Sequence, residues 1–329
     1  MLFAPAADLS ALDEEPGVEW EFLASADPVL SAPLLDGFDA LLHLTPTVNA
    51  ESLERAERLA VLARSGVGLD AIDVAACTAA GVAVTITPGG VARPMASAAA
   101  TLVFALAHRL TERNDAFHRG AWDEGRAGLV GTGLAGRVLG LIGFGRIGRE
   151  LNRLLGPFDL RTIVSTPRLA EETAREHGVE RADLETLLRE SDFVVVACPL
   201  TAETFHLLDE RRLALMKPTA FLVNVARGAI VDQRALGRAL AAGRIAGAGL
   251  DVFEQEPIDA ADPLVGTPNV IAAPHSLGYT DELLASCIGG ACAAILAVAR
   301  GEIPPHVVNE DVLESSTFRR KLRALAGPG

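Results

Sequence analysis

Three side chains in this sequence could together carry out hydride transfer to a ketone and the proton transfer that accompanies it. An imidazole can give or accept a proton near neutral pH, and a neighbouring carboxylate can orient the ring and stabilise the imidazolium. A guanidinium can hold a substrate carboxylate and polarise its carbonyl. The residues are His275, Glu256 and Arg227. Each also has a structural interpretation: a strand-end histidine, a turn residue before Pro257, and an arginine that caps a helix or contacts a phosphate.

Each of these residues follows a short apolar segment typical of a buried strand, at residues 222–225, 250–253 and 270–274. The sequence after residue 148 alternates such segments with helical patterns. We predict strands at 161–165, 193–197, 220–225, 245–251 and 270–273, and helices at 170–176, 184–189 and 233–242. Parallel strands joined by helices form a doubly wound sheet, which binds its ligands at the carboxyl ends of the strands. The three candidates are therefore expected to converge.

Upstream, residues 137–148 read as an apolar strand that runs into a glycine-rich turn and a helix. The turn has the G-x-G-x-x-G spacing, at Gly143, Gly145 and Gly148. These glycines can provide a tight turn, a close approach of backbone to a pyrophosphate, and close packing of helix on strand. The free N–H groups of the helix would bind the diphosphate. The motif alone could also be an ordinary loop, and its strand and helix context favours a dinucleotide site.

The remaining segments predict a second α/β region and several helices. Strands are expected at 40–44, 59–64 and 81–86, with a helix starting at 51–58 and an open turn at 65–68. Residues 95–110 are predicted to form a helix too apolar to face water, followed by a loop around Trp122. Residues 282–299 are predicted to form another long helix, and we expect the basic residues 319–323 on a solvated tail or surface helix.

Length and composition restrict the class of protein. The chain has 329 residues, which favours two domains. A net charge of −14 argues against nucleic acid or an anionic membrane as partner, and no apolar run reaches membrane-spanning length. The four cysteines suit a reducing compartment, no metal site is expected, and the first residues show no export signal. We therefore expect a cytoplasmic protein.

Taken together, the motifs resemble those of the D-isomer-specific 2-hydroxyacid dehydrogenases. The resemblance covers most of the chain and keeps the family's order. It rests on residues 66–74, 87–89, 120–122, 140–148, 198–204, 216–218, 224–228, 249–253, 256–257 and 274–275.

The resemblance implies an α/β fold of two doubly wound parallel-sheet domains, Rossmann-like or flavodoxin-like. An NAD(P)-binding Rossmann domain, residues 94–280, would be inserted into a substrate domain formed by residues 1–93 and 281–329. It also implies a homodimer formed through the cofactor domain. The implied activity is hydride transfer between a nicotinamide dinucleotide and the 2-carbon of a small D-2-hydroxy acid or 2-keto acid.

The resemblance also implies roles for individual residues. His275 would be the acid/base, Glu256 its partner, and Arg227 the group that binds and polarises the substrate. The amides of Val67 and Gly68 would hold the substrate carboxylate, and Asp251 would bind the nicotinamide carboxamide. The residues expected to bind the cofactor are Gly143, Gly145, Arg146, Ile147, Gly148, Ser165, Thr166, Pro167, Arg168, Cys198, Pro199, Thr204, Val225, Ala226, Arg227, Asp251, His275 and Gly278.

One departure from the family pattern bears on the cofactor. Thr166 stands where the family usually has an acidic residue that pairs with the adenosine ribose. Without that carboxylate nothing repels a 2′-phosphate, and Arg168 or Arg161 could attract one. NADP is therefore a candidate beside NAD, since a hydroxyl and backbone groups can still hold an unmodified ribose.

The substrate class narrows by comparison with other members of the family. Similar formate dehydrogenases have Gln where Glu256 stands, phosphite dehydrogenases have Lys where Val67 stands, and phosphoglycerate dehydrogenases commonly add a regulatory domain. A small or medium 2-keto acid remains, such as glyoxylate or hydroxypyruvate. The alternative is a dinucleotide-sensing protein on the same fold, like the transcriptional corepressors that resemble these enzymes.

Overall fold

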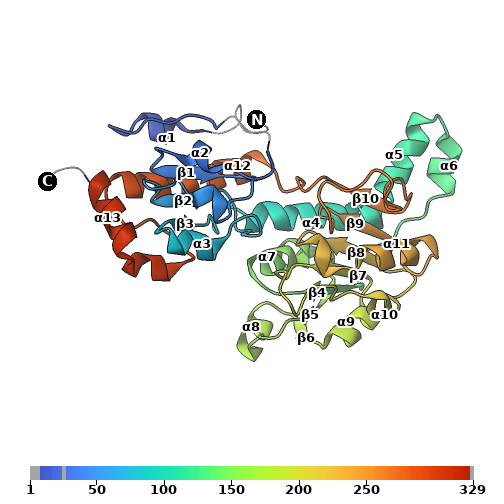
Figure 1. The fold of residues 1–329 in the computed structure, drawn as a ribbon. Coiled ribbons are helices and arrows are strands. Elements are labelled where there is room, and N and C mark those ends of the chain that lie inside the picture. Colours follow the sequence, from blue (N-terminus) through green and yellow to red (C-terminus); the bar gives the residue numbers. More distant parts are fainter. Residues whose placement is uncertain (1–7, 24–26, 327–329) are drawn as a thin grey trace. The chain divides into compact units, whose positions relative to one another are not determined.

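The computed structural model describes residues 8–23 and 27–326, which form two compact units (Figure 1). One unit combines Met1–Val91 with Tyr279–Gly329, and the other is the continuous segment Ala92–Gly278. The chain thus leaves the first unit, builds the second and returns. Residues 1–7, on which the expected lack of an export signal rests, lie outside the described residues.

The continuous unit is built on a seven-stranded sheet in which every neighbouring pair is parallel. From edge to edge its strands are β10 (Val270–Ala272), β9 (Gly247–Leu250), β8 (Phe221–Asn224), β7 (Phe193–Val196), β4 (Val138–Ile142), β5 (Arg161–Ser165) and β6 (Glu180–Arg181). The order reverses between β4 and β7, and open α/β sheets bind their ligands at the carboxyl ends of the strands beside such a switch point. The glycine turn follows β4 and therefore lies at that switch point.

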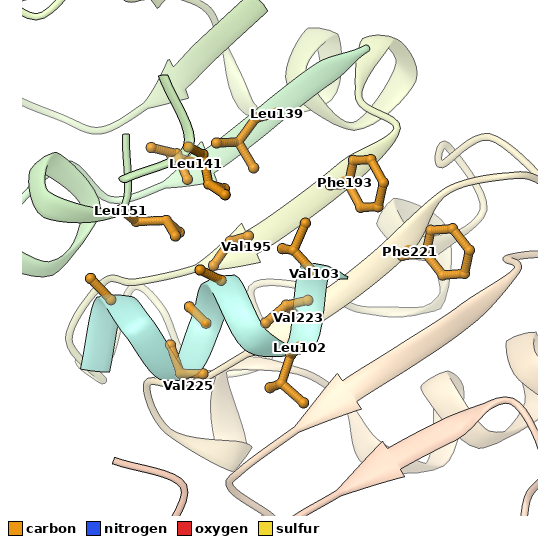
Figure 2. Packing of buried hydrophobic residues seen from close by; sticks show 14 of the residues in the cluster. Leu102, Val103, Leu139, Leu141, Leu151, Phe193, Val195, Phe221, Val223 and Val225 are labelled. Atoms are coloured by element: carbon orange, nitrogen blue, oxygen red, sulfur yellow. The ribbon is translucent and has the colours of Figure 1, made fainter. Parts of the chain in front are cut away.

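Helices cover both faces of this sheet. Alternate strand residues such as Leu139, Leu141 and Val195 share one core with α4, α7 and α8, and the intervening residues such as Val194 and Val196 share another with α9, α10 and α11. Figure 2 shows Leu102 and Val103 of α4 among the strand residues of the first core. The helices are α4 (Ala92–Ala107), α5 (Leu110–His118), α6 (Trp122–Ala127), α7 (Arg146–Leu155), α8 (Glu171–Glu176), α9 (Leu184–Glu190), α10 (Glu210–Leu213) and α11 (Gln233–Ala241), with 3₁₀ turns η2 (Gly156–Phe158) and η3 (Gly228–Ile230).

The discontinuous unit has a smaller parallel sheet in the order β1 (Ala40–His43), β2 (Val61–Arg64), β3 (Ala83–Thr85). Leu41, Leu62 and Val84 pack on one side, and Val61 and Ala63 pack on the other. Its helices are α1 (Ser10–Asp13), α2 (Ala32–Leu35), α3 (Val74–Ala79), α12 (Asp281–Ala299) and α13 (Ser316–Leu325), with η1 (Glu51–Leu53) and η4 (Glu310–Glu314). The expected α/β class with parallel sheets is confirmed.

The expectation that no apolar run could span a membrane is wrong in one place. Helix α12 is long and apolar enough to cross one by length and composition. Within its unit, however, Ile288, Ala291 and Ile295 pack in one core with Ala60 and Val61 beneath the sheet. Burial of one face under the small sheet accounts for this apolar sequence.

Three local predictions differ from the structure. The helix expected from residue 51 is only the turn η1, because the chain makes short-range bonds, Glu54 to Glu51 and Ala56 to Leu53, before it enters β2. The apolar helix ends at Ala107, where Arg109 adopts a left-handed conformation (φ 50°). Helices α5 and α6 then occupy the region expected to be a loop around Trp122.

The basic residues near the C-terminus are also not a uniformly solvated surface. Helix α13 buries Phe318 and, one turn later, Lys321, which is 7% exposed. The Lys321 ammonium donates to the carbonyls of Leu59 and Ala80 at 2.8 Å and of Ala56 at 3.3 Å. These bonds satisfy its donors without a carboxylate partner and attach α13 to the unit.

Candidate active site

The glycine turn joins β4 to α7, and each of its glycines has a different environment. Gly143 has a φ of 96°, and a Cβ there would lie 2.8 Å from the Ala197 carbonyl oxygen and the Cys198 nitrogen. A Cβ on Gly148 would lie 2.8 Å from the Gly143 carbonyl oxygen. At Gly145, by contrast, a Cβ would meet no described heavy atom within 4 Å. Two glycines therefore serve packing within the protein, and Gly145 leaves open space beside its backbone.

The first turn of α7 meets the requirements of an anion site. No side chain caps the helix at Gly145, and no acidic residue stands in its first turn. The N–H groups of Arg146 and Ile147 thus begin a ten-residue helix whose positive dipole end favours negative charge. A diphosphate beside Gly145 fits the open space there and the positive dipole end of this helix.

The segment after β5 lies next to the same turn, because the Gly143 amide donates to the Ser165 carbonyl at 2.9 Å. Ser165 and Thr166 are half-buried, whereas Pro167 and Arg168 are exposed. Arg161 is not a candidate for the 2′-phosphate. It is the first residue of β5 and therefore lies at the amino end of the strand, away from the glycine turn. Its guanidinium pairs with Glu180 at 2.8 Å and with Glu190 at 2.9 Å.

The loop after β7 is held by its own hydrogen bonds. The Thr204 hydroxyl donates to the Pro199 carbonyl at 2.8 Å and accepts from the Thr201 amide at 2.7 Å. Burial raises the pKa of the Cys198 thiol to about 11, so the thiol stays protonated at neutral pH. Cys198 is therefore suited to contact with an apolar or neutral group.

Two residues shape the turn that presents Arg227 after β8. The buried Asn224 side chain donates to the Arg227 carbonyl at 2.9 Å and accepts from the Ala226 amide at 3.0 Å. Gly228 lies so close to the chain after β9 that a Cβ would sit 1.9 Å from the Phe253 carbonyl carbon. No role for Asn224 was predicted from the sequence. A polar residue at the end of a buried apolar strand indicates a side chain that bonds the backbone of the following turn.

Glu256 and His275 form a close pair. Glu256 Oε2 lies 2.7 Å from His275 Nδ1, and Glu256 Oε1 accepts from the Phe253 amide at 3.0 Å. Partial burial opposes ionisation of Glu256, but the His275 hydrogen bond, the Phe253 amide and the charges of His275 and Arg227 outweigh it and lower the carboxyl pKa. Glu256 is therefore an anion at neutral pH, and Arg227 lies near enough to contribute to that state.

Asp251 supports the turn that carries His275. It is 1% exposed, and its Oδ1 accepts from the amides of Ser276 and Leu277 at 2.9 and 3.0 Å. Burial raises the pKa of the Asp251 carboxyl, against the effect of these two amides. His275 itself adopts a left-handed conformation with a φ of 52°. Sequence reasoning considered Asp251 only for the nicotinamide and missed this support, which links positions 25 residues apart.

Val67 and Gly68 belong to the discontinuous unit, in the turn after β2. Val67 is 40% exposed, and among the described residues neither its amide nor that of Gly68 donates to a protein acceptor. Two neighbouring N–H groups without an internal acceptor can bind a carboxylate. Across the described residues, no group of three or more His, Cys, Asp or Glu side chains could hold a metal ion.

Comparison with known proteins places these features in a family context. The sequence pattern of the D-isomer specific 2-hydroxyacid dehydrogenase NAD binding domain matches residues 100–276. A glyoxylate reductase from Thermococcus litoralis is 43% identical over 284 residues, which cover 84% of this chain and 86% of the relative.

Two solved structures have the same fold. The TT0316 protein from Thermus thermophilus matches with a TM-score of 0.82 and 34% identity, covering 92% of this chain and 97% of that chain. A glyoxylate reductase from Paecilomyes thermophila matches with a TM-score of 0.75 and 29% identity, covering 85% and 86%.

Proposed function

The chain belongs to the D-isomer specific 2-hydroxyacid dehydrogenase family, and we propose that it reduces glyoxylate or a related small 2-keto acid. It is an oxidoreductase that transfers a hydride between a nicotinamide dinucleotide and the 2-carbon of a 2-hydroxy or 2-keto acid. The choice of a small keto acid rests on the relatives named glyoxylate reductase. The assignment of residues rests on one observation, the 2.7 Å contact between Glu256 and His275 beside Arg227.

In the proposed mechanism His275 moves the proton. Ionised Glu256 accepts a hydrogen bond from the Nδ1–H of His275, so Nδ1 keeps its proton. Nε2 of His275 is therefore the atom that exchanges a proton with the substrate. A nicotinamide dinucleotide held at Gly145 and the first turn of α7 would supply the hydride to the substrate 2-carbon, which leaves a negative charge on the carbonyl oxygen. The imidazolium of His275 gives its Nε2 proton to that oxygen, and Glu256 stabilises the imidazolium before the transfer.

Arg227 and the 65–68 turn hold the substrate in this proposal. The guanidinium of Arg227 binds the substrate carboxylate and polarises the carbonyl, so the oxygen is more negative when the hydride arrives. In the discontinuous unit, the neighbouring amides of Val67 and Gly68 are the proposed donors to a substrate carboxylate. Asn224 and Asp251 fix the turns that carry Arg227 and His275.

The test is a steady-state assay of the purified protein against a panel of 2-keto acids, followed by the His275→Ala variant. The wild type should reduce at least one small 2-keto acid, and His275→Ala should lower kcat by about a hundredfold or more. His118→Ala, on the exposed end of α5, is the matched control and should keep wild-type activity. A protein that only sensed a dinucleotide would bind it without turnover, and a His275→Ala variant with near wild-type kcat would refute the proton-transfer role.

The cofactor is NADP or NAD, and the residues after β5 favour acceptance of NADP. They are Thr166, which has no charge, and Arg168, whose exposed guanidinium can pair with a 2′-phosphate. We expect Arg168→Ala to lower kcat/KM with NADPH and to leave kcat/KM with NADH unchanged. Arg175→Ala, an exposed arginine on α8, is the control. A wild type that strongly prefers NADH would contradict the argument from Thr166.

The proposed assembly is a homodimer formed by the region of α5 and α6 in the cytoplasm. Phe117, Trp122 and Val130 are 64%, 66% and 81% exposed there, a cluster of apolar side chains that suits a protein interface. Changing Phe117 and Trp122 together to Ser should halve the mass measured by light scattering. Phe205→Ser, which alters an aromatic residue of similar exposure in the loop after β7, should keep the dimer.

A further inference from the structure

Thr87 is hydrogen-bonded to the turn of residues 65–68, and no role was predicted for it from the sequence. Thr87 follows β3, which lies beside β2 in the small sheet, and is 6% exposed. Its hydroxyl accepts from the Gly66 amide at 2.7 Å, and its own amide donates to the Gly66 carbonyl at 2.9 Å. Thr87 thus binds both sides of the residue that precedes Val67.

Gly66 depends on such support because its conformation is unusual. Its φ is 132°, which side-chain-bearing residues rarely adopt, and glycine populates other conformations about as readily. The hydrogen bonds to Thr87, which include a longer one of 3.3 Å from the Thr87 hydroxyl to the Gly66 carbonyl, select that conformation from the many open to glycine. At the other end of the turn, Arg64 Nε donates to the Gly68 carbonyl at 3.0 Å. With both ends fixed, the amides of Val67 and Gly68 have a defined direction.

The Thr87 side chain is itself held by packing against α12. A Cβ on Gly290 would lie 2.8 Å from the Thr87 methyl group, so the helix can approach there only because residue 290 is glycine. The buried Cys287 thiol, also on α12, lies near the Thr87 hydroxyl, which lowers the thiol pKa against the effect of burial. A side chain held on its methyl and hydroxyl sides keeps one rotamer and can position the group above it.

We propose that Thr87 is a positioning residue that pre-orients the Val67 and Gly68 amides for the substrate carboxylate. The inference rests on the proposed function, in which these amides bind that carboxylate. Thr87 does not touch the substrate, so its loss acts on substrate binding through the turn. The expected signature is a raised KM for the keto acid, since the carboxylate is bound in the ground state and the transition state alike.

The experiment compares Thr87→Val, Thr87→Ser and Thr85→Val with the wild type. Thr87→Val keeps the shape and removes the hydroxyl, and should raise the keto-acid KM about tenfold while kcat and the dinucleotide KM stay within about twofold. Thr87→Ser retains the hydroxyl and should return the KM to within about threefold of wild type. Thr85→Val changes a buried threonine of β3 that makes no hydrogen bond to the turn and should leave the KM unchanged.

Inhibition by oxalate, an unreactive dicarboxylate, measures anion binding apart from turnover. Its inhibition constant should rise in parallel with the KM in Thr87→Val. Thr87→Ala, which leaves space for the chain to relax, should show the same rise and serves if Thr87→Val does not fold. A keto-acid KM within twofold of wild type in either folded variant overturns the proposal, as does a Thr87→Ser variant as impaired as Thr87→Val. Failure of the wild type to reduce any 2-keto acid would instead refute the proposed function.

Discussion

Gly145→Ala tests whether the glycine turn is the diphosphate site. Gly145 has φ −78° and ψ −160°, which alanine adopts without strain, and a Cβ there meets no described heavy atom within 4 Å. The substitution should therefore leave the fold intact and stabilise it by about 0.4–1 kcal/mol, because alanine restricts the unfolded chain. The added methyl would occupy the open space in which a pyrophosphate approaches the backbone.

The cost to cofactor binding follows from the interactions that the methyl would disturb. Hydrogen bonds to a charged group are each worth about 1.5–3 kcal/mol, and the helix dipole adds about 0.3–1 kcal/mol. Loss of one such bond and part of the dipole term amounts to about 3 kcal/mol, or about a hundredfold in Kd. Titration of NADH and NADPH followed by nucleotide fluorescence measures the Kd, and thermal unfolding measures the stability.

Gly143→Ala is the matched control, because it adds the same methyl two residues away, at a position where the protein backbone leaves no space for it. At φ 96° and 2.8 Å from the backbone of Ala197 and Cys198, the methyl strains the turn and should lower the free energy of unfolding by about 1–3 kcal/mol. A Gly145→Ala variant with wild-type dinucleotide affinity would show that the diphosphate binds elsewhere. A Gly145→Ala variant that loses several degrees in Tm would show that the space around Gly145 is occupied.

Three further predictions concern charge. Glu256→Gln removes the anion that faces His275 Nδ1 at 2.7 Å. In steady-state assays kcat for keto-acid reduction should fall at least about tenfold, with the dinucleotide KM unchanged. An unchanged kcat would show that Glu256 has no part in the mechanism. Burial lowers the pKa of Lys321 from 10.5 to about 8, so the unfolded chain binds more protons between these values and stability rises with pH there, by up to about 3 kcal/mol. Lys321→Met should lack this rise in urea unfolding measured at pH 8 and 10. Burial lowers the pKa of His43 from 6.5 to about 4, so stability falls as pH drops through that window. His43→Asn should lose less stability than wild type between pH 6.5 and 4.5, and equal losses would contradict the buried state of this ring.

The sheet of the continuous unit could be predicted closely from the sequence, for a physical reason. A parallel strand covered on both faces must be apolar throughout, so segments such as Phe193–Val196 and Phe221–Asn224 stand out from their surroundings. The convergence of Glu256 and His275 followed, because the carboxyl ends of parallel strands meet at one edge. The strand β6, only two residues long and exposed, carries no such signal and was missed.

Other features depend on contacts that no local pattern reports. The apolar periodicity that predicts a helix continues through Leu110, but the chain breaks at Arg109, where the left-handed conformation starts α5 in a new direction. Lys321 stands in a basic run typical of a solvated surface. It lies three residues after buried Phe318, on the same face of α13. Three backbone carbonyls from distant segments accept hydrogen bonds from its ammonium.

Three residues whose supporting role was not predicted from the sequence share one physical task. Asn224, Asp251 and Thr87 are buried polar residues at or just after the carboxyl ends of strands, and each is hydrogen-bonded to the backbone of a turn. A turn without such a partner would have N–H groups satisfied only by water and would sample several conformations. Because these partners are buried, the turns hold their conformation before any substrate arrives, and less binding energy is needed to order them. The substitution of a turn's buried partner should therefore change binding or catalysis more than the substitution of an exposed residue in the same turn.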